Sequence, residues 1–80
     1  MLRGMPRYFF DVSLENGPWS EDDGGTDLPD DEAARVAALD LALTVAKEPP
    51  VVVGALAVRV RNHEPYSLAT VRLLVETENR

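Results

Sequence analysis

An acidic stretch, residues 21–27, contains the residue types from which calcium sites are built. A calcium loop of the EF-hand type needs oxygen ligands at positions 1, 3 and 5, a glycine at position 6 and a glutamate at position 12. If Gly24 is placed at position 6, Trp19 takes position 1 and Asp30 takes position 12; if Gly25 is placed there, a glycine takes position 5. Neither alignment fits. We interpret the stretch as a solvated turn that leads into a helix cap, and we expect no metal site.

His63 is the only histidine, and the chain contains no cysteine. A zinc site would therefore need one nitrogen ligand and several carboxylates, which is an unusual set. His63 lies in the turn-forming segment Asn62-His63-Glu64-Pro65, where we expect an exposed side chain. No Ser/His/acid arrangement is visible, and nothing brings two carboxylates into one pocket with shifted pKa values. We expect no catalytic residue, no cofactor and no enzymatic activity.

Three arginines, Arg59, Arg61 and Arg72, are expected on the outer face of a sheet, with Phe9 near them. Some RNA-binding modules use basic and aromatic residues on a sheet in this way, but they pair aromatic residues on adjacent central strands, and that pairing is missing here. The interpretations are a solvated face with cross-strand ion pairs, a protein-contact face or a nucleic-acid surface. The candidate cross-strand partners are Asp11, Ser13, Glu15 and Glu76.

The charge of the chain argues against general binding of nucleic acid. The net charge is −6, and residues 1–48 carry 4 basic and 11 acidic side chains, whereas residues 49–80 carry 4 and 3. Neutralisation of phosphate dominates nucleic-acid affinity, so an acidic chain starts at a disadvantage. The second half, with a net charge of +1, still permits a local basic patch.

Composition and length indicate one soluble domain over residues 1–80, with residues 1–5 and 77–80 disordered. The longest strongly apolar stretch, residues 51–58, is far shorter than the roughly 20 residues that span a bilayer. The N-terminus lacks the apolar segment of a secretory signal. Because a chain without cysteine fits a reducing compartment, we expect a cytoplasmic protein that has no contact with membranes.

The first half of the chain is expected to form two strands. Tyr8, Phe10, Val12 and Leu14 alternate with more polar residues, which predicts a half-buried strand with these four side chains toward a helix. Asn16-Gly17 is a hairpin signal, because both residues tolerate positive φ. A short second strand follows around residues 18–21, at a sheet edge because of Pro18.

Residues 31–47 are expected to form a single helix. Asp30 is the predicted N-cap, Pro29 excludes a helix that runs through from upstream, and Glu48-Pro49-Pro50 ends it. One apolar stripe is expected to face the sheet, namely Ala34, Ala38, Leu41 and Val45.

A second apolar row on the helix consists of Val36, Leu39 and Leu43, with Ala46. A single helix on one sheet cannot bury both rows. Either the stripe is wide and the 49–54 loop covers part of it, or the row is a subunit interface, since exposed apolar patches mark contact sites.

The second half is expected to form a hairpin. Leu56, Val58 and Val60 alternate with Ala57, Arg59 and Arg61, and a further alternating segment covers residues 69–75. The expected fold is α+β: a four-stranded, mostly antiparallel sheet with one helix on one face, in the order β-β-α-β-β.

Two segments resemble a known family. Met5-Pro6-Arg7-Tyr8-Phe9-Phe10-Asp11 is similar to the opening of a family of short uncharacterised proteins, mostly alphaproteobacterial, known only as a domain of unknown function. The family's acidic-glycine turn and its helix start are matched by Asp22, Gly25 and residues 28–35 (Leu-Pro-Asp-Asp-Glu-Ala-Ala-Arg). The resemblance covers residues 5–75, although residues 62–65 differ from the Asp-Glu-x-Gly-like turn usual there. It implies no catalytic or binding residues.

The expected function is that of a small non-enzymatic interaction module that forms a homodimer and binds an unknown protein partner. The alternative is a nucleic-acid-associated accessory or regulatory protein that uses the arginine-bearing face. A small-ligand or metal sensor has less support, because no pocket is recognisable in the sequence. The residues expected at a contact surface are Val36, Leu39, Leu43, Phe9, Arg59, Arg61, Arg72 and Leu74.

Overall fold

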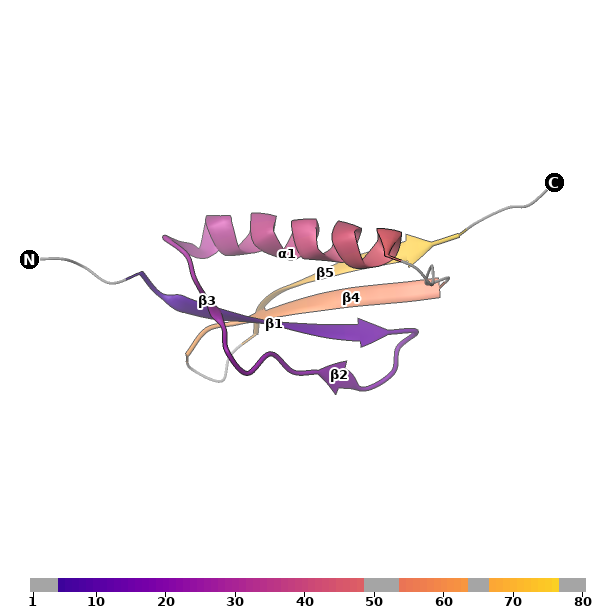
Figure 1. The fold of residues 1–80 in the computed structure, drawn as a ribbon, viewed down its shortest axis with the longest axis horizontal. Coiled ribbons are helices and arrows are strands. Elements are labelled where there is room, and N and C mark those ends of the chain that lie inside the picture. The colour runs from indigo at the N-terminus through magenta and orange to yellow at the C-terminus, as the bar shows by residue number, and fades with distance from the viewer. Residues whose placement is uncertain (1–4, 49–53, 64–66, 77–80) are drawn as a thin grey trace, which may run out of the picture.

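The computed structural model describes residues 5–48, 54–63 and 67–76. Their elements, in chain order, are β1 (Arg7–Leu14), β2 (Trp19–Ser20), β3 (Thr26–Asp27), α1 (Asp31–Lys47), β4 (Gly54–Arg61) and β5 (Ser67–Val75). The expected α+β class, with one helix on one face of the sheet, is confirmed (Figure 1). The sequence did not predict β3, a two-residue strand at the end of the acidic stretch, so the sheet has five strands instead of four.

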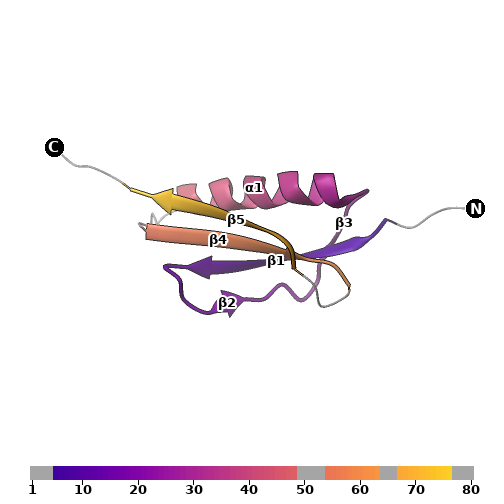
Figure 2. The same cartoon turned by 180° about the vertical axis from the view of Figure 1, so that it is seen from behind.

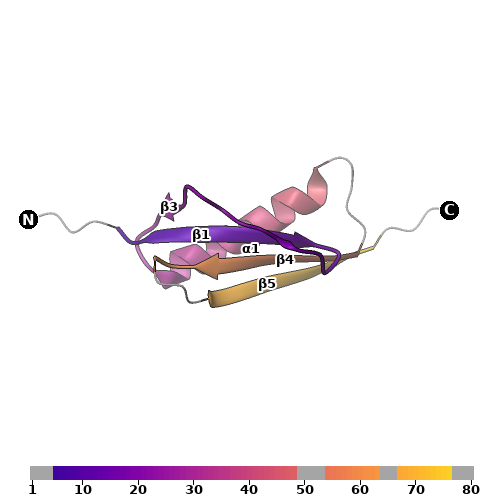
Figure 3. The ribbon, with the colours of Figure 1, turned by 90° about the horizontal axis from the view of Figure 1, so that it is seen from below.

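All strand pairs are antiparallel, and the path of the sheet is β2-β1-β4-β5, with β3 also paired to β1. The long strands β1, β4 and β5 lie side by side, and β5 forms one edge (Figures 2 and 3). The central strands β1 and β4 come from opposite parts of the chain. The pairing of these two strands therefore joins the two halves of the molecule.

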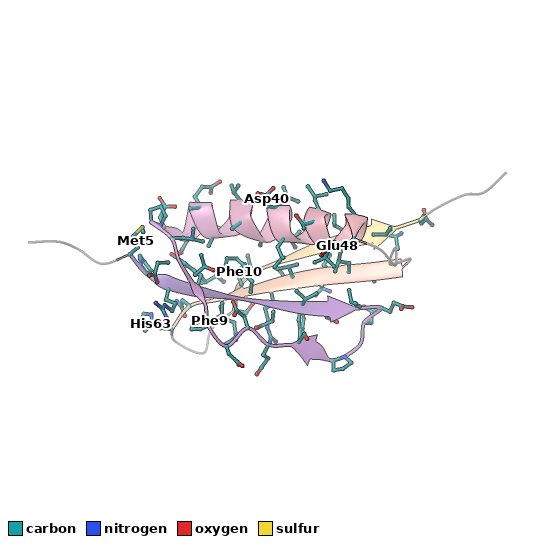
Figure 4. All side chains as sticks on the ribbon, in the orientation of Figure 1. Met5, Phe9, Phe10, Asp40, Glu48 and His63 are labelled. Carbon is teal, nitrogen blue, oxygen red and sulfur yellow. The ribbon has the colours of Figure 1, made fainter. Side chains whose placement is uncertain are left out.

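The core lies between α1 and the sheet. Its buried residues are Tyr8, Ala34, Ala38, Ala42, Leu56, Val58 and Val60. Phe9 and Phe10 are neighbours on β1 and point to opposite sides of it, Phe10 toward α1 (Figure 4). The predicted alternation of β1 is thus correct, although Leu14, at the end of the strand, is 42% exposed.

The buried stripe of α1 differs in part from the prediction. Ala34, Ala38 and Ala42 are fully buried, whereas Leu41 and Val45 are only partly buried against the core. Alanine at i, i+4 and i+8 brings the helix backbone close to the sheet, and the longer side chains then fill the flanks of the contact. The face turned away from the sheet carries Asp40 (Figure 4).

Both ends of α1 are as predicted. The Asp30 carboxylate accepts a hydrogen bond from the Ala33 N–H at 2.8 Å, and Glu48 is the C-cap. The Tyr8 hydroxyl donates to Asp31 Oδ1 at 2.7 Å, which ties the first turn of the helix to β1. This hydrogen bond, with burial and the charge of Asp31, raises the pKa of Tyr8 to about 12.

The hairpin turn after β1 lies one residue earlier than expected. Glu15 and Asn16, not Asn16 and Gly17, have positive φ values of 54° and 58°. The Gly17 N–H donates to the Leu14 carbonyl at 2.9 Å and closes the turn. Glycine suits position 17, because a Cβ there would make a tight contact of 3.0 Å with the Leu14 carbonyl oxygen.

Several predictions concern the two ends of the chain and its loops. The disorder expected for residues 1–5 and 77–80 lies outside the described residues except for Met5, and the loop cover expected from residues 49–53 lies outside them as well. In the segment 62–65, Asn62 and His63 are described, and His63 is exposed as predicted.

Candidate functional site

The face of the sheet opposite α1, which is turned toward the viewer in Figure 3, carries a cluster of ion-paired side chains. It is built from alternate residues of the long strands: Phe9, Asp11 and Ser13 on β1, Ala57, Arg59 and Arg61 on β4, and Thr70, Arg72 and Leu74 on β5. The β2 hairpin lies over the β1 side of this face (Figure 1). We call this surface the outer face.

Asp11 is completely buried at the centre of the outer face. Its Oδ2 accepts hydrogen bonds from Arg59 Nε at 2.9 Å and Arg61 Nε at 2.6 Å. Its Oδ1 accepts from Arg61 Nη2 at 2.9 Å and from the Asp22 N–H at 3.0 Å. Both carboxylate oxygens are therefore satisfied, as a buried charge requires.

These contacts keep Asp11 ionised. Burial alone would raise the pKa of this carboxyl group, but the hydrogen bonds from Arg61 and from the Asp22 backbone outweigh it, with a further contribution from Arg59. The pKa of Asp11 is lowered to about 2. A carboxylate in this state is a structural anion and has no tendency to take up a proton near neutral pH.

Asp22 connects the acidic loop to the exposed edge of β1. Its carboxylate accepts from the Phe10 N–H at 3.2 Å and from the N–H groups of Gly24 and Gly25 at 3.1 and 3.2 Å. β2 pairs with one end of β1 and β3 pairs with the other end, so Asp22 satisfies the strand donor between them. The acidic stretch is thus a built loop, and the expectation of a purely solvated turn was wrong for Asp22.

Two aromatic rings hold the arginines in place. The Arg59 guanidinium lies 4.4 Å from the centre of the Trp19 ring, and that of Arg61 lies 5.1 Å from the centre of the Phe9 ring. The side chains of Arg59 and Arg61 are only 23% and 25% exposed. Stacking and ion pairing together leave little of either cation available to a ligand.

A cavity of about 260 Å³ opens beside this cluster, between the β2 hairpin and β5. Trp19, Ser13, Ala57 and Arg72 face one another in one register row across four strands. Ser13 and Ala57 form the floor of the cavity, and Trp19 and Arg72 form its walls. Among the described residues, Arg72 has no hydrogen-bond or ion-pair partner, and its side chain is exposed.

Exposed apolar side chains lie on two other surfaces. Val36, Leu39 and Leu43, on the side of α1 turned from the sheet, are 58%, 45% and 46% exposed. Leu74, on β5, is 72% exposed. The predicted contact residues therefore do not form one surface: the helix row lies on one side of the molecule, and Phe9 and the arginines lie on the other.

Other candidate sites gain no support from the geometry. Across residues 5–48, 54–63 and 67–76, no three His, Cys, Asp or Glu side chains are grouped to hold a metal ion. Within the same ranges, no helix has the length and apolar character needed to cross a bilayer.

The sequence reasoning missed two parts of the outer face. The role of Asp22 was hidden because it stands among other acidic residues, and Trp19 was assigned only to a short strand. The signal that would have placed Trp19 is the hairpin itself, since the β1–β2 register brings Trp19 opposite Ser13. Asp11 was among the partners considered for the arginines.

Comparisons with known proteins agree with the resemblance to a domain of unknown function. A family model described as Domain of unknown function (DUF6894) matches residues 7–74, from the first residue of β1 to the last but one of β5. No curated protein is significantly similar to the chain. No solved structure is significantly similar either.

Proposed function

We propose that this chain, which belongs to the family described as Domain of unknown function (DUF6894), is a non-enzymatic protein-interaction module that associates with a second copy of itself through β5. The observation that carries the proposal is the open edge of the sheet. β5 is nine residues long and pairs only with β4 among the described strands. An edge strand of this length presents a row of backbone groups to another chain.

The two edges of the sheet differ in how they are protected. The exposed side of β1 is covered by the two short strands β2 and β3 and, between them, by the Asp22 carboxylate. β5 carries one charged residue, Arg72, and no proline. Natural edge strands that avoid association are short, carry several charges or contain proline. β5 lacks all of these features.

The backbone groups that β5 offers can be identified from the register. The Glu15 N–H donates to the Ala55 carbonyl at 2.6 Å, so the backbone of Ala55 points to β1. Because direction alternates along a strand, Leu56 and Val58 point to β5, where they pair with Leu73 and Val71. The N–H and C=O groups of Thr70, Arg72 and Leu74 therefore point away from the sheet.

Antiparallel pairing of β5 with its own copy fits a twofold axis. The register that pairs all nine residues places Val71 opposite the partner subunit's Val71. This register puts Thr70 opposite the partner subunit's Arg72, so the two arginines do not face each other, as like charges would be unfavourable there. It also keeps the acidic residues 21–27, at the other edge of each sheet, away from the contact.

Binding is a better interpretation than catalysis or nucleic-acid recognition. Asp11 has its oxygens occupied, and Arg59 and Arg61 are held by it, so only Arg72 of the expected arginine set is free of ion pairs in the described structure. A single cation on a chain of net charge −6 gives weak support for phosphate binding. We place the module in the cytoplasm, since a chain without cysteine draws no stability from disulfides.

Thr70→Pro tests the proposal. The Thr70 N–H points away from β4, so proline removes a donor to the second copy and leaves the β4–β5 pairing in place. Sedimentation velocity at high micromolar concentration should show a dimer for the wild-type chain. For the variant it should show a monomer with an unchanged circular dichroism spectrum, equivalent to at least a ~10-fold rise in the dissociation constant.

Leu43→Asp on α1 is the matched surface control and should remain a dimer. If Leu43→Asp or Leu39→Asp dissociates the dimer while Thr70→Pro does not, the helix row is the interface and the edge proposal is wrong. A wild-type chain that sediments as a monomer at that concentration would refute self-association altogether.

A further inference from the structure

The cavity on the outer face follows from one row of residues across four neighbouring strands. Trp19 of β2 pairs with Ser13 of β1, Ser13 with Ala57 of β4, and Ala57 with Arg72 of β5. Neighbouring strands lie about 4.8 Å apart, so Trp19 and Arg72 stand roughly 14 Å from each other across two small residues. The large–small–small–large order produces the cavity of about 260 Å³.

The lining of the cavity is mixed: Trp19, Ala55 and Ala57 contribute apolar groups, and Ser13, Asn16 and Arg72 contribute polar side chains, of which only Arg72 is charged. Ala55 and Ala57 provide methyl groups, and the Ser13 hydroxyl is already used, because it donates to the Gly17 carbonyl at 2.8 Å. The neighbouring Arg59 lies over Trp19 and is paired with Asp11 and Glu21. Arg72 is therefore the one cation at the cavity without an ion pair in the described part of the chain.

We propose that this cavity binds a small organic carboxylate with a single aromatic ring. The Arg72 guanidinium would take the carboxylate in a two-point contact, because its planar fork matches the two oxygens. The ring would lie over Ala57 and against Trp19, an arrangement that aromatic pairs favour. The cavity is smaller than the roughly 300 to 1,000 Å³ of pockets that hold drug-sized molecules, which limits the ligand to about one ring.

The site is independent of self-association. The Arg72 side chain projects from the outer face, whereas the proposed dimer contact uses the backbone groups at the edge of β5. A second copy paired to that edge would leave the cavity open. The two proposals can therefore fail separately.

Titration of ¹⁵N-labelled protein with phenylacetate, followed by NMR, tests the site. Phenylacetamide, which has the same shape and no charge, is the matched control ligand. We expect saturable shifts of the Trp19 indole N–H and of the Ser13, Ala57 and Arg72 amides with phenylacetate, with a dissociation constant on the order of 1 mM, and at least ~10-fold weaker binding of the amide.

Three variants at the cavity and one control variant on α1 separate the contributions. Arg72→Gln should weaken phenylacetate binding at least ~10-fold, and Arg72→Lys should restore part of it, because lysine keeps the charge and loses the two-point geometry. Ala57→Leu should abolish binding by filling the floor. Arg35→Gln removes an exposed arginine of α1 and should change nothing.

Each outcome decides the proposal. Absence of saturable shifts, equal binding of acid and amide, or undiminished binding by Arg72→Gln would overturn it. Circular dichroism of each variant establishes that the fold is retained, and if Ala57→Leu does not fold, the Arg72 variants carry the test. Phenylacetate binding by the Thr70→Pro variant would support the site whether or not the wild-type chain forms a dimer.

Discussion

Asp11 connects three separate segments of the chain. It receives hydrogen bonds from two β4 arginines, 48 and 50 residues away, and from the backbone of the acidic loop. Removing a carboxylate from water costs several kcal/mol, and the contacts with two cations and one N–H group offset that cost. The cluster fixes the position of the β2 hairpin over the sheet.

This arrangement predicts a specific loss of stability in acid. The pKa of Asp11 is about 2 in the folded chain, below its ordinary value of 3.8. The unfolded chain therefore takes up the proton first as the pH falls. The contribution of Asp11, about 2 kcal/mol, is complete above pH 4 or so and is lost as the pH falls through about 2. Urea unfolding measured between pH 6 and about pH 2 checks this.

Asp11→Asn should have a lower free energy of unfolding at pH 7 and should lack this part of the pH dependence. Asp23→Asn changes an exposed carboxylate of the same loop and should leave the stability curve unaltered. If Asp11→Asn is unfolded, the carboxyl carbon shift of Asp11 in the wild-type chain, followed by NMR, is the direct measurement. A midpoint near 4 would contradict the structure.

At the residue scale, the predicted partners of the arginines included Asp11, which pairs with Arg59 and Arg61, but not Glu21, which also pairs with Arg59. Alternation placed Asp11, Arg59 and Arg61 on the same face, and opposite charges on neighbouring strands were expected to pair. No local signal distinguished Asp22 from Asp23, because the difference is set by which carboxylate reaches the Phe10 N–H across the chain.

Among the elements, the acidic loop (residues 21–27) requires a backbone conformation that favours glycine. Gly25 has a φ of +76°, and a Cβ there would lie 2.7 Å from Arg7 Cγ and 2.9 Å from Phe9 Cε1. Gly24, its neighbour, has nothing within 4 Å of such an atom. The loop thus offers a pair of neighbouring glycines, of which only Gly25 is constrained by its φ and by adjacent side chains.

Gly25→Ala should lower the free energy of unfolding by about 1 to 3 kcal/mol, because alanine is strained at this φ and its methyl group meets two side chains. Gly24→Ala should change stability by less than about 0.5 kcal/mol. Urea unfolding of the two variants beside the wild-type chain provides the comparison. Equal effects at both positions would show that the loop does not hold the described conformation.

The helix and strand boundaries were predicted well where residues at the boundary itself determine them. The boundaries of α1 follow from Asp30 at its start and from Glu48-Pro49-Pro50 at its end. β3 was missed because two residues, Thr26 and Asp27, carry no periodicity and form a strand only where β1 offers them an edge. The turn after β1 was misplaced by one residue, since Glu15 takes the positive φ that glycine usually provides.

At the scale of the whole molecule, the proposed dimer predicts that thermal stability depends on protein concentration. Association of folded chains stabilises them by mass action, because unfolded chains do not form the contact. A ~100-fold increase in concentration should raise the thermal midpoint of the wild-type chain by several degrees and leave that of Thr70→Pro unchanged. Calorimetry or circular dichroism melts check this. A wild-type midpoint that does not move with concentration would contradict the dimer.

The order of strands could not be derived from the sequence, and this set the limit on predicting the site. The alternation of apolar residues predicted which face of each long strand is buried. It did not predict that β1 is a central strand or that β5 is an edge strand. The row from Trp19 to Arg72 exists only in the order β2-β1-β4-β5, so the cavity was invisible before the structure.

The pairing of β1 with β4 also has a consequence for how the protein is made. A ribosome that has released residues 7–47 has already produced β1 and α1, but β4, which pairs with β1 and packs against α1, has not yet been translated. At a translation rate of about 5 to 20 residues per second, several seconds pass between the synthesis of β1 and that of β4. During that interval β1 lacks the strand with which it pairs in the folded chain, and exposed apolar side chains such as Phe10 favour aggregation of the nascent chain.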